Sequence, residues 1–328
     1  MDILKRGSLK VAALAALLGL ALGATPAFAQ KYPSKPVTLV IPVTAGGSND
    51  VVGRVFAELL SKRLGQNVVV MNQPGRDGII GSAAVARGNP DGYTLLFADA
   101  SPFNFAQLLR DNLPYDPMKD FTPIGMFMYA PAVFAANPNA PFKNLTEMIA
   151  YAKANPGKIR MGAGSIVLQT AAEMLKYRAG IDIQVIPYKG GGPATIDAAG
   201  GHIEALSSGV ATVNSFVQNN RLRAIAIPSP TRATALPDTP TMIESGYPGF
   251  TAGTWFGVMG PKGMPADVVQ ILSEHIAEIS KAEGMTTLAQ KIGGNIEVHL
   301  RDDFAKRIQL ESERLAPTIK ASGLKITD

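Results

Sequence analysis

The 328-residue sequence contains no cysteine, one tryptophan and three histidines. Without cysteine there can be no disulfide, no thiolate metal site, no cysteine nucleophile and no lipid anchor on an N-terminal cysteine. The histidines, His202, His275 and His299, lie far apart and lack the spacing of metal ligands. We therefore expect neither a metal site nor a cofactor.

The sequence signatures of common enzyme classes are also missing. There is no G-x-S-x-G elbow for a serine hydrolase and no G-x-x-x-x-G-K-[ST] loop for nucleotide hydrolysis. Gly75-x-x-Gly78-x-x-Gly81 lacks the glycine spacing of a dinucleotide site, and the carboxylates are scattered rather than paired in glycine-rich loops. Basic tracts interleaved with aromatics are absent, which argues against nucleic acid as a partner. We predict a protein that is not an enzyme.

Residues 1–29 have the three-part pattern of a secretory signal peptide. Three basic residues precede an uncharged apolar run over 11–24, and Ala27-Phe28-Ala29 forms an A-x-A processing site. A membrane anchor is the alternative, but the run is shorter than the roughly 20 residues that a spanning helix needs. We predict export, cleavage near Ala29–Gln30 and a periplasmic mature protein.

The chain after residue 29 is longer than a single core usually serves, so we expect two lobes. The formal charge of the whole sequence is +5, and the leader contributes three bases and one acid to it. The remaining positive charge is small and would favour anionic small molecules.

The order of apolar runs and glycine-rich turns predicts alternating strands and helices, which is typical of parallel βαβ units. Strands are expected at 37–41, 68–71, 94–98, 159–161, 184–186, 202–206, 223–227 and 254–259. Helices are expected at 51–64, near 103, at 145–154, 167–179 and 196–199, and two or three more at about 266–280, 284–291 and 302–321. Two apolar stretches meet at Ala130-Pro131, where a second series begins. We predict one lobe from residues 30–130 and 253–328, and a second lobe from residues 131–252.

Four strand-to-helix turns consist of glycine and of small hydroxyl or amide residues: Thr44–Asp50, Ala100–Asn104, Gly162–Leu168 and Tyr188–Thr195. Glycine permits close approach of backbone N–H groups, and the following helix directs unpaired N–H donors toward a ligand. One such turn alone can be a simple connection. Two in each half predict a site that clamps an anion with neutral donors rather than with an arginine fork.

Many ordered segments carry a resemblance to one family, among them YPSKPVTLVIPVTAGGSND, NQPGRDGIIG, NPDGYTLLF, IPYKGGGPATIDAAGG and TWFGVMGPKGMP. In these segments the chain resembles the Bug-type solute-binding receptors of tripartite tricarboxylate transporters, over essentially all of its length after the leader. The resemblance implies an α/β, two-lobed periplasmic-binding-protein (Venus-flytrap) fold. Each lobe is expected to be a mostly parallel sheet flanked by helices, with the ligand cleft between the lobes.

The resemblance also implies that the turn at Gly46–Asp50 holds one end of a carboxylate ligand, partly through ordered water, and that second-lobe loops hold the other end. The candidate ligand-binding residues are Thr44, Gly46, Gly47, Ser48, Asn49, Asp50, Ser101, Phe103, Asn104, Ala163, Gly164, Ser165, Gln169, Tyr188, Lys189 and Gly190. For some of them a structural role is equally open: Asp50 suits a helix N-terminus, and the stem of Lys189 could pack on the surface.

The chain departs from the family pattern at several positions. Ala45 stands where the family usually has proline, Arg76-Asp77 interrupts a glycine-rich loop, and Gln169 stands where a histidine is usual. Phe103 and Phe105 favour a longer or aromatic ligand if they face the cleft, and they belong to the core if they do not.

We therefore predict a periplasmic receptor for a small carboxylate, either a C4–C6 dicarboxylate or an aromatic carboxylate. It would deliver this ligand to the membrane permease subunits of a tripartite tricarboxylate transporter, and we expect it to be a monomer. An exported enzyme or a sensor subunit using the same cleft is the alternative.

Overall fold

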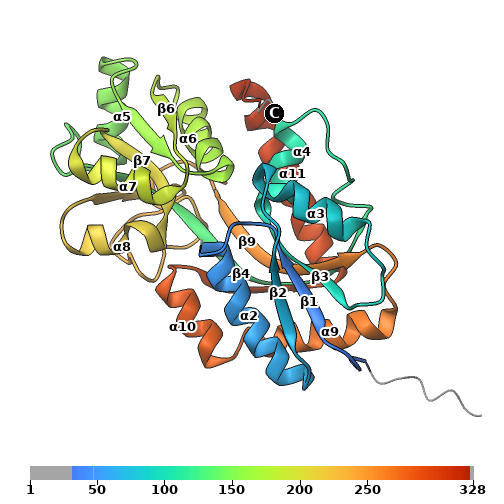
Figure 1. Ribbon diagram of the computed structural model, residues 1–328. Helices are drawn as coiled ribbons and strands as arrows, with labels where there is room; N and C mark the ends of the chain where they lie inside the picture. The colour runs from blue at the N-terminus through green and yellow to red at the C-terminus, as the bar shows by residue number, and fades with distance from the viewer. Residues whose placement is uncertain (1–31, 47, 326–328) are drawn as a thin grey trace, which may run out of the picture. The chain divides into compact units, whose positions relative to one another are not determined.

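The computed structural model describes residues 32–46 and 48–325, and residues from Lys35 onward belong to one compact unit (Figure 1). The predicted leader lies outside the described residues, as do Gly47 and the side chain of Ser48. Among the described residues, no helix is both long and apolar enough to cross a membrane.

The first half of the sheet is built around the buried strand β1 (Val37–Ile41). Their order is β2 (Val68–Asn72), β1, β3 (Thr94–Asp99), β9 (Gly253–Pro261), β4 (Phe121–Ala136) and β10 (Asn295–Leu300). β1 and β3 consist mainly of buried apolar residues because strands and helices cover them on all sides. We call these six strands the first half-sheet.

The long strand β4 continues the sheet into a second half. Its pairing partner changes from β9 at Pro131, opposite Gly253, to β7 (Ala205–Gly209) at Ala132, opposite Gly209. Pro131 has no backbone N–H, so the change of partner strand at this residue leaves no N–H group there without an acceptor. β8 (Arg223–Ala226) also pairs with β4, whereas β7 leads on to β5 (Arg160–Ala163) and β6 (Gln184–Pro187). We call the end of β4 with β5–β8 the second half-sheet.

The pairing directions partly correct the expectation of mostly parallel sheets. β1 is parallel to β2 and β3, and β5 is parallel to β6 and β7. The central strands β4 and β9 pair antiparallel with each other, and every pair that joins them to another strand is antiparallel. The reason is that the chain crosses between the half-sheets along β4 and returns along β9.

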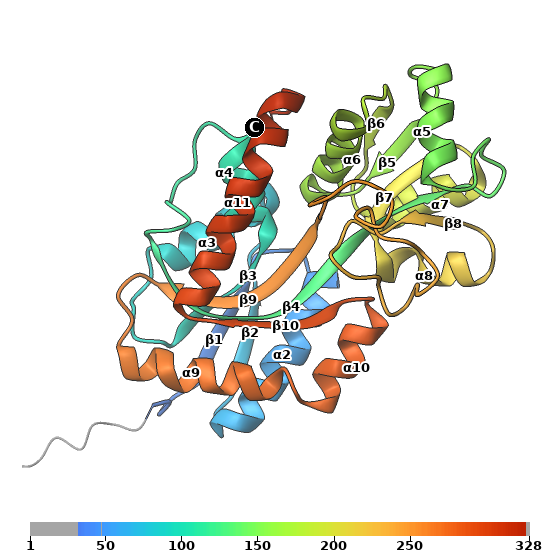
Figure 2. The ribbon, with the colours of Figure 1, turned by 180° about the vertical axis from the view of Figure 1, so that it is seen from behind.

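Helices cover both faces of the first half-sheet (Figures 1 and 2). One face carries α2 (Ser48–Leu64), α9 (Ala266–Ile279) and α10 (Glu283–Lys291). The other carries α3 (Ile79–Ala86), α4 (Ala106–Leu109) and α11 (Asp302–Ser322). Adjacent strand residues point to opposite faces of a sheet, and two neighbours on β9 illustrate this. The Trp255 ring packs edge-on against Phe304 of α11, whereas the Phe256 ring stacks on the ring of Phe97.

The second half-sheet is covered by α5 (Leu145–Ala154), α6 (Ile166–Ala179), α7 (Gly191–Gly200) and α8 (Val210–Gln218). Buried residues of α5 and α6 join the same apolar core as α11, and α6 packs directly against that helix. Buried residues of α7 and α8 form a separate core, which includes Val133, Leu206 and Val213. The sheet is therefore packed on both faces in this half as well.

Most expected elements are confirmed, several to within one or two residues of their ends. The expected elements did not include α3, α8 or β10, and the two apolar stretches that meet at Ala130-Pro131 form the single long strand β4, which was not predicted as a strand. The sequence of α8, VATVNSFVQ, is rich in β-branched residues, which favour helix only weakly. The helix expected near Phe103 is a short π-helical turn, η2 (Ser101–Phe105), followed by the single turn α4, and β7 begins at Ala205 rather than at His202.

Candidate ligand-binding site

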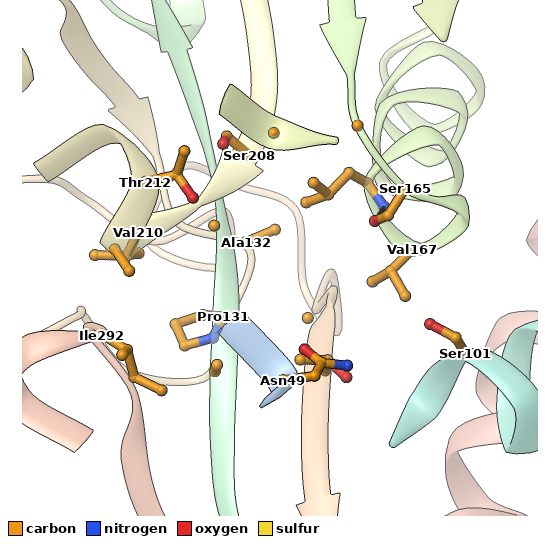
Figure 3. Close-up of a pocket in the computed structure, with 18 of the residues that line it drawn as sticks. Asn49, Ser101, Pro131, Ala132, Ser165, Val167, Ser208, Val210, Thr212 and Ile292 are labelled. Carbon is orange, nitrogen blue, oxygen red and sulfur yellow. Dashed lines mark hydrogen bonds between the residues drawn. The ribbon is translucent and has the colours of Figure 1, made fainter. Parts of the chain in front are cut away.

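A pocket of about 220 Å³ lies where β4 and β9 connect the two half-sheets (Figure 3). Ala130, Pro131 and Ala132 of β4 and Thr254 and Phe256 of β9 form its back wall. In Figure 3, Ser165, Ser208 and Thr212 lie on one side of the pocket, and Asn49 and Ser101 lie on the other. None of the described residues that line it carries a charge.

Four helices in the described part of the chain contribute their first turns to the pocket wall. Asn49 belongs to the first turn of α2, Val167 to that of α6, Gly191 to that of α7 and Thr212 to that of α8. The first N–H groups of a helix have no partner within the helix and lie at its positive end. Such N–H groups make the pocket suitable for an anion without any basic side chain.

Hydroxyl groups of the second half-sheet add further donors. Ser165 is the N-cap of α6, where its Oγ accepts a hydrogen bond from the Leu168 N–H at 3.4 Å. Ser208 is the next-to-last residue of β7 and is fully buried, and its Oγ has no hydrogen-bond partner among the described residues. A buried hydroxyl is costly unless it is satisfied. Ser208 therefore has a free hydrogen-bonding group directly at the pocket.

On the opposite side, a buried carboxyl group holds Asn49 and Ser101. Asn49 Nδ2 donates to Asp99 Oδ2 at 2.8 Å, and the Ser101 N–H donates to Asp99 Oδ1 at 2.7 Å. Burial raises the pKa of Asp99 to about 6; hydrogen bonds from Ser101 and Asn49 act in the opposite direction, and the charge of Asp77 adds to the increase. Asp99 thus lies behind the pocket wall and positions two of the residues that form it.

Asp50 stabilises the turn that precedes α2. Its Oδ2 accepts hydrogen bonds from the Gly46 N–H at 2.8 Å and Arg54 Nε at 2.9 Å, and its Oδ1 accepts one from Asn72 Nδ2 at 2.8 Å. Burial opposes its ionisation, but the hydrogen bonds from Arg54, Gly46 and Asn72 outweigh this and lower its pKa to about 2. Asp50 does not line the pocket, and its geometry supports the structural role.

Two loops of the second half-sheet approach each other through glycine. A Cβ atom at Gly164, after β5, would lie 2.2 Å from the carbonyl carbon of Gly190, in the loop before α7. Gly190 itself has φ +106°, which favours glycine. The absence of side chains here allows the starts of α6 and α7 to border the same pocket.

The pocket brings together only some of the sixteen residues predicted from the sequence. Asn49, Ser101, Gly164 and Ser165 line it. Thr44 and Gly46 are exposed in the turn before α2, Ala163 is buried at the end of β5, and Gln169 is half-buried on α6. Gly47 and the side chain of Ser48 lie outside the described residues.

Phe103 and Asn104 lie in the core rather than at the pocket. Phe103 is fully buried and packs edge-on against Phe121, with ring centroids 4.9 Å apart. Asn104 is also fully buried and accepts a hydrogen bond from Trp255 Nε1. The π-helical turn η2 directs both side chains inward, and only its first residue, Ser101, reaches the pocket.

The loop before α7 contributes less side-chain chemistry than the sequence suggested. Tyr188 Oη donates to Asp197 Oδ2 at 2.7 Å, and Lys189 is exposed. Neither residue lines the pocket, and Gly191 is the residue of this region that does. The loop therefore reaches the site through its backbone.

Ser208, Thr212, Thr254 and Ile292 line the pocket but were missed in the sequence. Ser208 and Thr212 flank the start of α8, a helix that the sequence pattern did not predict. The segment ALSSGVAT around them has the same succession of strand, small residues and helix as the four turns that were recognised. That similarity was the signal that could have identified them.

The sequence matches the family described as "Tripartite tricarboxylate transporter family receptor" over residues 52–324. Protein BugT of Bordetella pertussis is 36% identical over 306 residues, which cover 92% of this chain and 94% of BugT. A protein of Cupriavidus necator from the gbd 5' region is 35% identical over 266 residues, which cover 80% of each chain.

Solved structures agree with this match. A structure described as that of a periplasmic transporter is 36% identical, with a TM-score of 0.80 over 90% of this chain and 99% of that chain. R. palustris Rpa4515 with adipate is 27% identical, with a TM-score of 0.80 over 90% and 99% of the two chains. MatC (Rpa3494) from Rhodopseudomonas palustris with bound malate is 26% identical, with a TM-score of 0.75 over 88% and 100%. The chain therefore belongs to the receptors of tripartite tricarboxylate transporters, which are non-catalytic solute-binding proteins with an α/β periplasmic-binding-protein fold.

Proposed function

We propose that this receptor binds a linear C4–C6 dicarboxylate in the pocket between the half-sheets and delivers it to the permease subunits of its transporter. The observation that carries this proposal is the position of neutral donors on both sides of an uncharged pocket. The first turns of α6, α7 and α8 lie on one side and the first turn of α2 on the other. A ligand with a carboxylate at each end would meet helix N-termini at both.

The relatives support the same ligand class. Adipate, in Rpa4515, and malate, in MatC, are linear dicarboxylates of the proposed length. An aromatic carboxylate is the weaker candidate because Phe103 and Phe105, the residues that suggested it, are fully buried. The pocket of about 220 Å³ also suits a small ligand.

We propose that residues 30–130 and 253–328 form one lobe and residues 131–252 the other. The change of partner along β4 at Pro131, together with the start of β9 at Gly253, supports these boundaries. We also propose that the mature protein begins near Gln30 and acts in the periplasm, since residues 1–29 have the pattern of a cleaved signal peptide. We further propose that it acts as a monomer.

The test is a thermal-shift and calorimetric comparison of succinate, adipate and terephthalate, with glucose as the uncharged control. A dicarboxylate present at about 100 times its Kd should stabilise the protein by about 2.7 kcal/mol. Tight binding of glucose, with none of the acids detected, would show that the carboxylate proposal is wrong. Tightest binding of terephthalate would make the aromatic candidate the correct one.

A further inference from the structure

Asp99 is a buried acid directly behind the wall of the binding pocket. It ends β3, is 2% exposed, and accepts hydrogen bonds from Asn49 and Ser101, both of which line the pocket. Among the described residues, no basic side chain forms an ion pair with it. A buried carboxylate without a cationic partner is costly, and this one lies on the side where the proposed ligand would place a carboxylate.

The ionised form of Asp99 determines how Asn49 is oriented. An ionised carboxylate can only accept hydrogen bonds, so Asn49 must turn its amide NH₂ group toward Asp99. Its carbonyl oxygen Oδ1 then lies at the other end of the amide. A carbonyl oxygen repels a carboxylate, and so does the negative charge behind it.

Protonation of Asp99 reverses this arrangement. A protonated carboxyl group has an O–H to donate, so it can donate to Asn49 Oδ1 and allow the amide to turn its NH₂ group to the pocket. We infer that this receptor takes up one proton at Asp99, from the solvent, when it binds a dicarboxylate. This inference rests on the proposed function, and it makes Asp99 a positioning residue that acts through Asn49.

The other acids near Asp99 already have basic partners, so Asp99 is the group there that can take up a proton. Asp77, on η1 (Arg76–Gly78), pairs with Arg110 at 2.8 Å, and Asp50, on α2, pairs with Arg54 at 2.9 Å. Tyr115 also faces Asp99, and burial raises its pKa, so it stays neutral. The neighbouring strands β1 and β9 and the turn η2 bring no titratable side chain.

The pKa of Asp99 lies close enough to neutral pH for the group to gain a proton on ligand binding. Burial raises its pKa to about 6 before any ligand is present. A ligand carboxylate near the first turn of α2 would raise this pKa further, because like charges disfavour ionisation. Dicarboxylate affinity should therefore be greatest when Asp99 is already protonated and should fall as the pH rises above about 6.

The test is calorimetry of adipate and succinate binding between about pH 6.5 and about pH 8.5, where both free ligands carry two charges. Titrations in PIPES and in imidazole, which differ in ionisation enthalpy, count the protons taken up. For the wild type we expect close to one proton per ligand near neutral pH. Affinity should fall about tenfold per pH unit until the pH exceeds the pKa of Asp99 in the complex.

Asp99→Asn is the decisive variant because its neutral amide resembles the protonated acid. It should bind with no proton uptake and with an affinity that does not change with pH. Glu58→Gln is the control, since Glu58 is an exposed acid of α2 paired with Lys62. It should keep the wild-type pH profile.

The outcomes are distinct. Dicarboxylate binding by the wild type without proton uptake would overturn the coupling but leave the proposed function intact. A pH slope retained in Asp99→Asn would overturn it too, because another group would then be titrating. If neither acid binds at any pH, the proposed function is wrong, and the coupling is wrong with it. If Asp99→Asn does not fold, as judged by circular dichroism, the wild-type proton count decides alone.

Discussion

Trp255 Nε1 donates a hydrogen bond to Asn104 Oδ1 at 2.7 Å, and both side chains are fully buried. The same Asn104 amide donates through Nδ2 to the carbonyl oxygen of Ile308 and to Ser312 Oγ, both at 2.8 Å. One side chain after β3 therefore links strand β9 to helix α11. Asn104 had been predicted to bind the ligand, but all of its hydrogen-bonding atoms have partners within the core.

Asn104→Ala should destabilise the protein without weakening ligand binding. The substitution leaves the indole N–H of Trp255 buried without an acceptor, which costs about 1–3 kcal/mol. Urea unfolding measures this loss. Asn219→Ala is the control, because the Asn219 side chain is exposed and donates to the Ser215 carbonyl oxygen at the end of its own helix. Equal stability of the two variants would contradict the role assigned to Asn104.

Ser208→Ala should weaken dicarboxylate binding with little effect on stability. Its hydroxyl is buried at the pocket without a partner among the described residues, and a hydrogen bond to a charged group contributes about 1.5–3 kcal/mol. The neighbouring Ser207 is a matched control. It is equally buried, and its hydroxyl also has no partner among the described residues, but it points to the opposite face of β7. Calorimetry should show a loss of about tenfold or more for Ser208→Ala only. Equal affinities would exclude Ser208 from the site.

Gly164→Ala should disrupt the pocket because the new methyl group would collide with backbone atoms, so the loops after β5 and before α7 would have to move apart. The added methyl group would lie 2.2 Å from the backbone of Gly190. In Gly284→Ala, on α10, the new methyl would meet only Leu59 at an ordinary 3.8 Å. Thermal unfolding and ligand titration of both variants test this. Normal ligand affinity in Gly164→Ala would show that the two loops are not in the tight contact described.

Asp50→Asn should lower stability by about 2 kcal/mol at neutral pH, because the pKa of Asp50 is lowered from 3.8 to about 2 in the folded protein. A lowered pKa stabilises the fold above the unfolded-state value, and this stabilisation is lost as the pH falls. The difference between wild type and variant should therefore shrink between about pH 4 and about pH 2. Urea unfolding across this range measures it, and a difference that stays constant with pH would contradict the role of Asp50.

Much of the fold could be predicted from the sequence because its signals are local. Val37–Ile41 and Leu145–Ala154 have the same bounds in the sequence pattern and in the structure, since a buried apolar run and an Asn-capped helix are both read over a few residues. The antiparallel pairing of β4 with β9 joins strands more than a hundred residues apart. No local pattern specifies such a pairing, so the mixed centre of the sheet was missed.

The sequence by itself determined the family, the order of most elements and the glycine-rich turns that make an anion site possible. Only the tertiary structure decided which of the neutral donors meet at the pocket. Side-chain direction reverses from one residue to the next along a strand and depends on the exact start of a helix. For that reason Ser208 reaches the pocket and Ser207 does not, and Ser101 reaches it while Phe103 and Asn104 pack into the core.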